Sequence, residues 1–204
     1  QVSGGLSTVG IGDAVYLEAQ VVKGTPVTDI VWNLGTQPGG STATLEASPL
    51  GSEVPIYDPA YQLEYDVAGR QLLIPDTNGL FIVTATVTTN GGGSIILNKT
   101  IAAAKYVGVG TIDGNIPSFQ KGQCGSCHGS DPDGKVANWA TTGHATMFTE
   151  AIDGLKSSHY NEGCISCHTL GYNTNALANN DGFDDIAELV GWTFPATLEP
   201  GNWA

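Results

Sequence analysis

The sequence predicts two domains, an all-β N-terminal half at residues 1–105 and a mainly α or irregular C-terminal half at residues 106–204. The first half contains no cysteine and no histidine and is rich in Val, Thr, Gly and Ala. All four cysteines and all four histidines of the 204-residue chain lie in the second half. A chain of this length accommodates two small domains.

The N-terminal half is expected to form a β-sandwich. Apolar residues alternate with other residues in two segments, 15–21 and 79–88, and this period of two is typical of half-buried strands. Residues 94–101, which follow three glycines at 91–93, form a third expected strand. Trp32, within a further apolar stretch at 28–33, has the character of a core tryptophan. Short strands separated by Gly, Pro and Asn indicate two packed antiparallel sheets.

Two helices are expected in the C-terminal half. Residues 136–153 carry an apolar side chain at every fourth position, and His144 lies on the same stripe. Gly154 follows as the expected C-cap. Residues 183–190 form the second helix, with carboxylates near its start and Gly191 at its end. Because an imidazole among apolar side chains costs free energy unless it is paired, His144 needs a partner.

Every cysteine lies in one of two C-x-x-C-H pentapeptides, at residues 124–128 and 164–168. This is the attachment motif of c-type haem. The two thiols add across the haem vinyl groups, and the histidine that follows is an axial ligand of the iron. The sequence therefore predicts two covalently attached c-type haems. The expected attachment residues are Cys124, Cys127, His128, Cys164, Cys167 and His168.

The cysteines have three alternative uses. Paired C-x-x-C motifs also hold structural zinc, but zinc would use the four cysteines alone and would leave the histidine after each pair unexplained. A redox dithiol needs a single motif in a βαβ context, which the sequence lacks. Structural disulfides are the third alternative.

The histidine count indicates the remaining iron ligands. Two six-coordinate haem irons need four axial ligands, and outside the motifs the chain has two histidines, His144 and His159. Both are therefore expected to bind iron, with Met147, the single methionine, as the competitor. His159 lies five residues before Cys164, too close to reach the far face of that haem easily. We expect His159 to serve the first haem and His144 the second, with the swapped assignment as the alternative.

The C-terminal half resembles the multihaem c-type cytochromes over about residues 120–203. Residues 139–145, Trp-Ala-Thr-Thr-Gly-His-Ala, are similar to their W-x-x-[ST]-x-H-A segment, in which the histidine is a distal haem ligand. Residues 159–168 are similar to their H-x-x-x-x-C-x-x-C-H arrangement. The resemblance implies iron-binding roles for His144 and His159 and leaves open which haem each serves.

Residues 10–105 resemble the PKD-type immunoglobulin-like domains. A tryptophan strand leads into residues 38–45, Pro-Gly-Gly-Ser-Thr-Ala-Thr-Leu. Residues 75–87, beginning Pro-Asp-Thr-Asn-Gly, then match the P-D-x-x-G-x-Y/F-x-V pattern of that family, with Phe81 at the usual tyrosine position. The resemblance implies a seven-stranded immunoglobulin-like sandwich that serves as an extracellular spacer or adhesion module.

Charge and location are consistent with an exported protein. The chain has 20 acidic and 7 basic residues, a formal net charge of −13, which argues against binding nucleic acid. No apolar run is long enough to span a membrane. Because c-type haem is attached outside the cytoplasm, we expect an extracellular or periplasmic protein whose signal peptide was removed before Gln1.

These features predict an electron carrier rather than an enzyme. Iron with two histidine ligands has no open position for a substrate, which leaves outer-sphere electron transfer. The expected partners are redox proteins or extracellular electron acceptors. Edge strands of the sandwich also allow a homopolymer, an extracellular cytochrome filament. The alternative is a module of a multihaem oxidoreductase, with peroxidase or nitrogen-oxide chemistry at one open haem.

Overall fold

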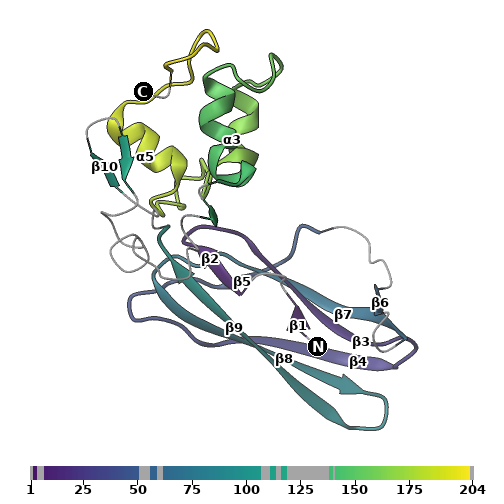
Figure 1. Cartoon of the computed structure of the whole chain (residues 1–204). Helices are drawn as coiled ribbons and strands as arrows, with labels where there is room; N and C mark the ends of the chain where they lie inside the picture. The colour runs from purple at the N-terminus through teal and green to yellow at the C-terminus, as the bar shows by residue number, and fades with distance from the viewer. Residues whose placement is uncertain are drawn as a thin grey trace. The chain divides into compact units, whose positions relative to one another are not determined.

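The structure is a computed structural model in which two compact units are distinguished (Figure 1). The first unit comprises residues 1–105 and 175–180, and the second comprises residues 106–174 and 181–204. The structure describes residues 7–50, 62–106, 138–139 and 141–202 in full, and only the backbone of residues 2–3, 56–58, 111–113 and 116–118.

The first unit contains two β-sheets. One has the strand order β1-β3-β7-β5, with β6 also paired to β7, and the other has the order β2-β9-β8-β4. The strands of the first sheet are β1 (Val2–Ser3), β3 (Val15–Val22), β5 (Leu45–Glu46), β6 (Ile56–Asp58) and β7 (Leu63–Leu73). Those of the second are β2 (Thr8–Gly10), β4 (Val27–Thr36), β8 (Gly79–Thr89) and β9 (Ser94–Ala104). All described pairings are antiparallel except that of β2 with β9.

The alternating segments of the sequence form the central strands, as predicted. In β8, every second residue from Phe81 to Val87 is at most 1 % exposed, so one face of the strand is buried along its length. Leu17 of β3 is also fully buried. These side chains form the two apolar clusters of the sandwich, because a period of two places alternate residues on the same face.

Trp32 is less buried than the sequence suggests. It lies on β4 and is partly buried, in contact with the clusters around Phe81 and around Ala85. The indole thus bridges the two parts of the core from an edge strand rather than filling its centre.

A contact between two loops joins the two segments that resemble the PKD pattern. The Asp76 carboxylate accepts hydrogen bonds from the Ser41 hydroxyl at 2.6 Å, the Thr42 amide at 2.6 Å and the Thr42 hydroxyl at 3.0 Å. Nearby, Gly79 has φ +136°, and a Cβ there would lie 2.6 Å from Cγ of Pro38. The residues that define the two segments of the pattern therefore lie together in one tight junction between the sheets. They are Pro38, Ser41, Asp76 and Gly79.

Residues 175–180 differ from the predicted domain boundary. The sequence placed them in the C-terminal half, whereas the structure packs them against the first unit. The buried Asn180 amide donates to the carbonyl of Ile11 at 2.9 Å. Ala178 is 2 % exposed, and a Cβ on Gly12, which has φ +81°, would lie 2.2 Å from its Cα. The segment has no periodic pattern, so only its tertiary contacts reveal where it belongs.

The described part of the second unit is built from short helices and one hairpin. Its elements are β10 (Thr111–Asp113), β11 (Ile116–Ser118), α3 (Gly143–Ile152), η1 (Glu162–Cys164), α4 (Ile165–His168) and α5 (Phe183–Val190). The prediction of α5 and of its end at Gly191 is confirmed. Gly191 adopts the left-handed conformation, and Trp192 N–H donates back to the Ala187 carbonyl at 2.8 Å, a Schellman-type end.

Helix α3 begins later than residue 136. Its N-cap is Thr142, whose amide and hydroxyl both donate to the Trp139 carbonyl, at 2.8 and 2.7 Å. Asn138 and Trp139, within the predicted helix, are also helical. Hydroxyl groups that bond to the preceding turn compete with helical hydrogen bonds. A prediction from the spacing of apolar residues does not take this competition into account. The predicted end is correct, since Gly154 follows the C-cap with φ +71°.

Phe81→Ala should lower the free energy of unfolding of the first unit by about 3–5 kcal/mol, because it leaves a cavity in a fully buried position. The measurement is guanidinium unfolding followed by the β-sheet circular dichroism signal. Leu80→Ala is the matched control: Leu80 is the preceding residue, 56 % exposed, and its loss should cost about 0.5 kcal/mol or less. Equal effects of the two substitutions would contradict the assigned core face.

Asp76→Ala should destabilise the first unit by about 1–2 kcal/mol at neutral pH, through loss of its hydrogen bonds. Partial burial acts to raise the pKa of Asp76, but the bonds from Ser41 and Thr42 outweigh it and hold the pKa below its usual value. The stabilisation is therefore present above the ordinary pKa of an aspartate and disappears as the pH falls through the folded-state value.

Unfolding measured between pH 7 and pH 2 checks this dependence. The difference between the native protein and Asp76→Ala should shrink as the solution becomes acidic. Asp29→Ala is the control, because no described residue hydrogen-bonds to the Asp29 carboxylate. A difference that grows on acidification would contradict the assigned role of Asp76.

Candidate functional site

The second C-x-x-C-H motif forms two consecutive short helical turns, η1 and α4. Cys164 ends the first turn, and residues 165–168 form the second. Cys164 is partly buried, whereas Cys167 and His168 are exposed. Both cysteines are free thiols, so no disulfide joins them. The two sulfurs and the imidazole expected from the sequence are thus grouped within five residues of one compact turn.

The start of this turn is fixed by Asn161. Its side-chain oxygen accepts from Gly163 N–H at 2.9 Å, and its amide donates to the His159 carbonyl at 3.0 Å. The end is fixed by Thr169, whose hydroxyl and amide both donate to the Ile165 carbonyl, at 2.8 and 3.0 Å. Because both ends are held by hydrogen bonds, the cysteine spacing is set by the backbone before any ligand is attached.

Ile165 anchors the motif to the unit. It is 3 % exposed although it lies between the two cysteines, so the turn buries its apolar residue and leaves Cys167 and His168 at the surface. Cys164 packs against a cluster formed by Ala151, Ile152 and Tyr160.

Aromatic rings continue from this cluster across the unit. The Tyr160 ring lies edge-to-face with His168, with centroids 5.5 Å apart, and stacks on Phe194 at 6.3 Å. Further contacts connect the remaining rings with centroid separations of 5.1 to 6.4 Å; they join Phe148, Phe183, Trp192 and Phe194. A connected set of rings beside the C-x-x-C-H turn provides an aromatic surface that suits packing against a large planar group.

From the sequence, the aromatic residues of the C-terminal half that are candidates for packing on haem are Phe119, Trp139, Phe148, Tyr160, Tyr172 and Trp192. The aromatic set agrees with these candidates only in part. Phe148, Tyr160 and Trp192 belong to it. Phe183 and Phe194 also belong to it, but they were not among the sequence candidates. Phe183 begins a predicted helix, and the sequence does not indicate which rings it contacts. Trp139 is 38 % exposed. Of the other candidates, Tyr172 has no described ring contact and Phe119 lies outside the described residues.

His159 has a local partner for one of its ring nitrogens. The Ser157 hydroxyl accepts the His159 backbone N–H at 3.1 Å and lies 3.4 Å from Nδ1 of the same residue. The hydroxyl either donates to Nδ1 or accepts its proton, depending on the tautomer of the ring, so this contact engages Nδ1 and not Nε2. His159 is exposed, so its other nitrogen is accessible.

His144 lies in the first turn of α3 and is exposed, whereas Ala151 and Ile152 at the other end of the helix are buried. The predicted apolar stripe is therefore covered only toward its C-terminal end. The first motif, Cys124, Cys127 and His128, lies outside the described residues. The structure consequently groups Cys164, Cys167 and His168, and it leaves the pairing of His144 and His159 with particular irons as a prediction.

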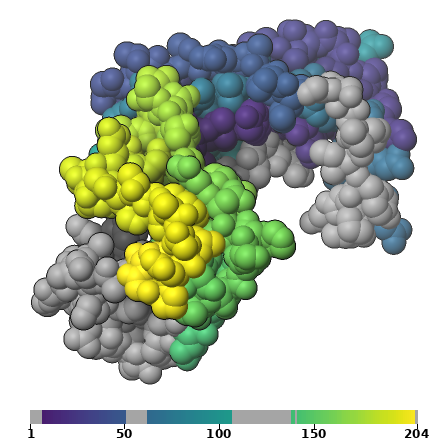
Figure 2. All heavy atoms as spheres, turned by 90° about the horizontal axis from the view of Figure 1, so that it is seen from above, coloured from purple at the N-terminus to yellow at the C-terminus, as the bar shows by residue number. Residues whose placement is uncertain are grey.

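The C-terminal segment closes over the end of α3. Leu198 packs on the Ile152 cluster, and the Asn202 amide donates to the Ile152 carbonyl at 2.8 Å and the Thr197 carbonyl at 2.7 Å. In Figure 2 the yellow C-terminal residues lie against the green residues of α3. This segment carries Trp192 and Phe194, so it supplies rings to the aromatic set.

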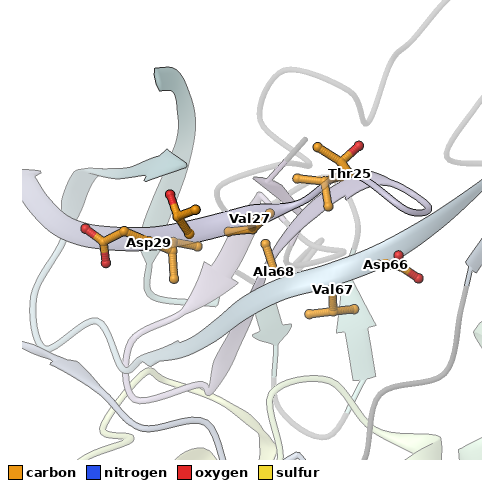
Figure 3. A pocket seen from close by; sticks show the side chains of 9 residues that line it. Thr25, Val27, Asp29, Asp66, Val67 and Ala68 are labelled. Carbon is orange, nitrogen blue, oxygen red and sulfur yellow. The ribbon is translucent and has the colours of Figure 1, made fainter. Parts of the chain in front are cut away.

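A second feature is an open hollow of about 440 Å³ in the first unit (Figure 3). It lies between β4, the turn before it and β7, and Asp29 and Asp66 lie on its rim. Asp66 already accepts a hydrogen bond from the Gly24 amide at 2.9 Å. The other lining residues are Val, Ala, Ile and Thr, so neither cysteine nor histidine lines the hollow.

Two further features are absent from the part of the chain that the structure describes. No group of three or more His, Cys, Asp or Glu side chains is arranged to hold a metal ion there. In the same part of the chain, no helix is long and apolar enough to cross a membrane. A tetrathiolate zinc site would require Cys124 and Cys127, which the structure does not describe.

Comparison with known proteins gives no assignment. No protein-family model matches the chain, and no curated protein matches it. The chemistry of the site therefore rests on its own residues.

Proposed function

We propose that the chain is an exported dihaem c-type cytochrome that carries electrons by outer-sphere transfer. The observation that carries this proposal is the turn at residues 164–168, where two free thiols and an exposed imidazole are grouped above a buried isoleucine. The same pentapeptide occurs at residues 124–128, which implies a second attachment site of the same kind.

Each residue of the turn has a distinct role in this proposal. Cys164 and Cys167 would hold the cofactor covalently, and His168 would supply a nitrogen ligand to its iron. The buried Ile165 and the hydrogen bonds of Asn161 keep the three groups in place. When bound, haem supplies an iron that changes by one electron between its ferric and ferrous states. The aromatic set around Phe148 and Trp192 would pack against the cofactor and limit its contact with water.

Whether His144 and His159 bind the irons distinguishes an electron carrier from a haem enzyme. With His144 and His159 on the irons, both are six-coordinate and closed to substrates. Both imidazoles are exposed, so neither is committed to the apolar core of the protein, and the Ser157 contact leaves Nε2 of His159 available. An open haem, as in a multihaem oxidoreductase, would instead require that one of these histidines does not bind.

Electron paramagnetic resonance of the oxidised protein tests the ligand set. We expect two low-spin haems in the native protein and one high-spin haem in each of His144→Ala and His159→Ala, because each variant lacks one axial ligand. Met147→Leu is the control and should leave the spectrum unchanged. A high-spin haem in the native protein would contradict the electron-carrier function and favour the enzyme alternative.

We further propose that copies of the chain assemble through the β-sandwich into an extracellular filament that extends the electron path. On the outer side of β9, β2 covers only Ala102–Ala104, and no described strand pairs with residues 94–101 on that side. Ile95 and Ile96 on this stretch are 58 % and 64 % exposed. An apolar edge strand of this kind is a template for pairing with another chain.

Assembly should increase with ionic strength, because copies with a formal charge of −13 repel one another until salt screens the charge. Light scattering and electron microscopy at high protein concentration measure it. Ile96→Lys should weaken assembly, since an edge lysine opposes strand pairing. Leu80→Lys is the control: Leu80 is also exposed, but its cross-strand partner Ala102 is already covered by β2. Monomeric protein under all conditions would refute the filament.

A further inference from the structure

Tyr160 carries a buried polar group that the proposed function does not use. The residue is 7 % exposed, and its hydroxyl has no hydrogen-bond partner among the described residues. Most buried polar groups in proteins are paired, so an unpaired one calls for an explanation. A tyrosine hydroxyl is neutral at physiological pH and can both donate and accept a hydrogen bond.

The position of the Tyr160 ring is fixed by its neighbours. It stacks on Phe194 with an interplanar angle of 23° and belongs to the buried cluster with Ala151 and Ile152. On another side it meets the His168 ring at 80°, with centroids 5.5 Å apart. The hydroxyl is therefore held in the immediate surroundings of the second C-x-x-C-H turn.

His168 needs a partner of this kind. An axial histidine that binds iron through Nε2 carries its proton on Nδ1, and that N–H is ordinarily donated to an oxygen, which fixes the ring and raises its basicity. The structure shows no hydrogen bond between a His168 ring nitrogen and any described residue. An oxygen without a donor and a nitrogen that needs an acceptor thus belong to two rings in contact.

We propose that the hydroxyl oxygen of Tyr160 accepts the Nδ1–H hydrogen bond of His168 when haem is attached at Cys164 and Cys167. This inference rests on the proposed function. Tyr160 is then a positioning residue: it orients the axial imidazole and makes it a stronger electron donor. A more basic imidazole stabilises the ferric state, so the hydrogen bond lowers the reduction potential of this haem relative to an unpaired histidine.

Tyr160→Phe tests the proposal because it removes the oxygen and keeps the ring. Spectroelectrochemical titration of the full chain should show a higher midpoint potential for one haem and an unchanged potential for the other. At a fixed applied potential, the ratio of the two oxidation states of that haem should change approximately threefold. This change corresponds to a shift of about 28 mV in the midpoint potential for one electron. Tyr172→Phe, in the same unit, is the matched control and should move neither potential.

Two outcomes would overturn the inference. Unchanged potentials would show that the hydroxyl does not act on His168, and a lowered potential would show that it donates to an acidic group instead. A second measurement uses the native protein and does not depend on the variant folding. In the ferrous state, the Nδ1–H proton of His168 should exchange slowly with solvent by nuclear magnetic resonance, and rapid exchange would also overturn the proposal.

The haem content distinguishes failure of this inference from failure of the proposed function. The native protein and both tyrosine variants should each carry two covalent haems by intact-mass measurement. If the native protein carries none, the proposed function fails. If it carries two and the potentials of native protein and Tyr160→Phe coincide, only the role of Tyr160 is refuted.

Discussion

The candidate site depends on the burial of Ile165 beneath the turn that contains both cysteines. An isoleucine that is 3 % exposed in a four-residue helix gives the turn an apolar anchor that its own backbone could not supply, since so short a helix is unstable alone. Cys167 and His168 then face outward because Ile165 faces inward. Asn161 and Thr169 fix the two ends, and Tyr160 packs beside the imidazole, so the donor groups are ordered by the polypeptide itself.

The strands were predictable from the sequence wherever burial enforced a period of two. The buried side chains of β8, from Phe81 to Val87, leave little freedom in register or face. Trp32 was harder to place. A tryptophan in an apolar stretch suggests a core residue, but its position on an edge strand leaves it partly exposed. Residues 175–180 could not be assigned, since the contacts of Ala178 and Asn180 with residues 11–12 depend on tertiary structure alone.

The grouping of the candidate site residues was more predictable than their surroundings. The motif at residues 164–168 predicts its donors by spacing, and the structure groups these residues in two consecutive short helical turns. The start of α3 was not predictable, because the Thr142 hydrogen bonds to Trp139 interrupt a continuous apolar pattern. The contact of Ser157 with the His159 ring and the position of the Tyr160 ring beside His168 emerge only when the chain is folded, since neither serine nor tyrosine is distinctive at those positions.

The central claim is that every cysteine of this chain binds haem covalently, and the intact mass of the protein isolated from its natural source tests it most directly. The account predicts a mass increase equal to two haems, no thiol that reacts with an alkylating reagent, and a pyridine haemochrome spectrum of the c type. A protein without added haem, with four reactive thiols or with a bound zinc ion that protects them, would contradict it.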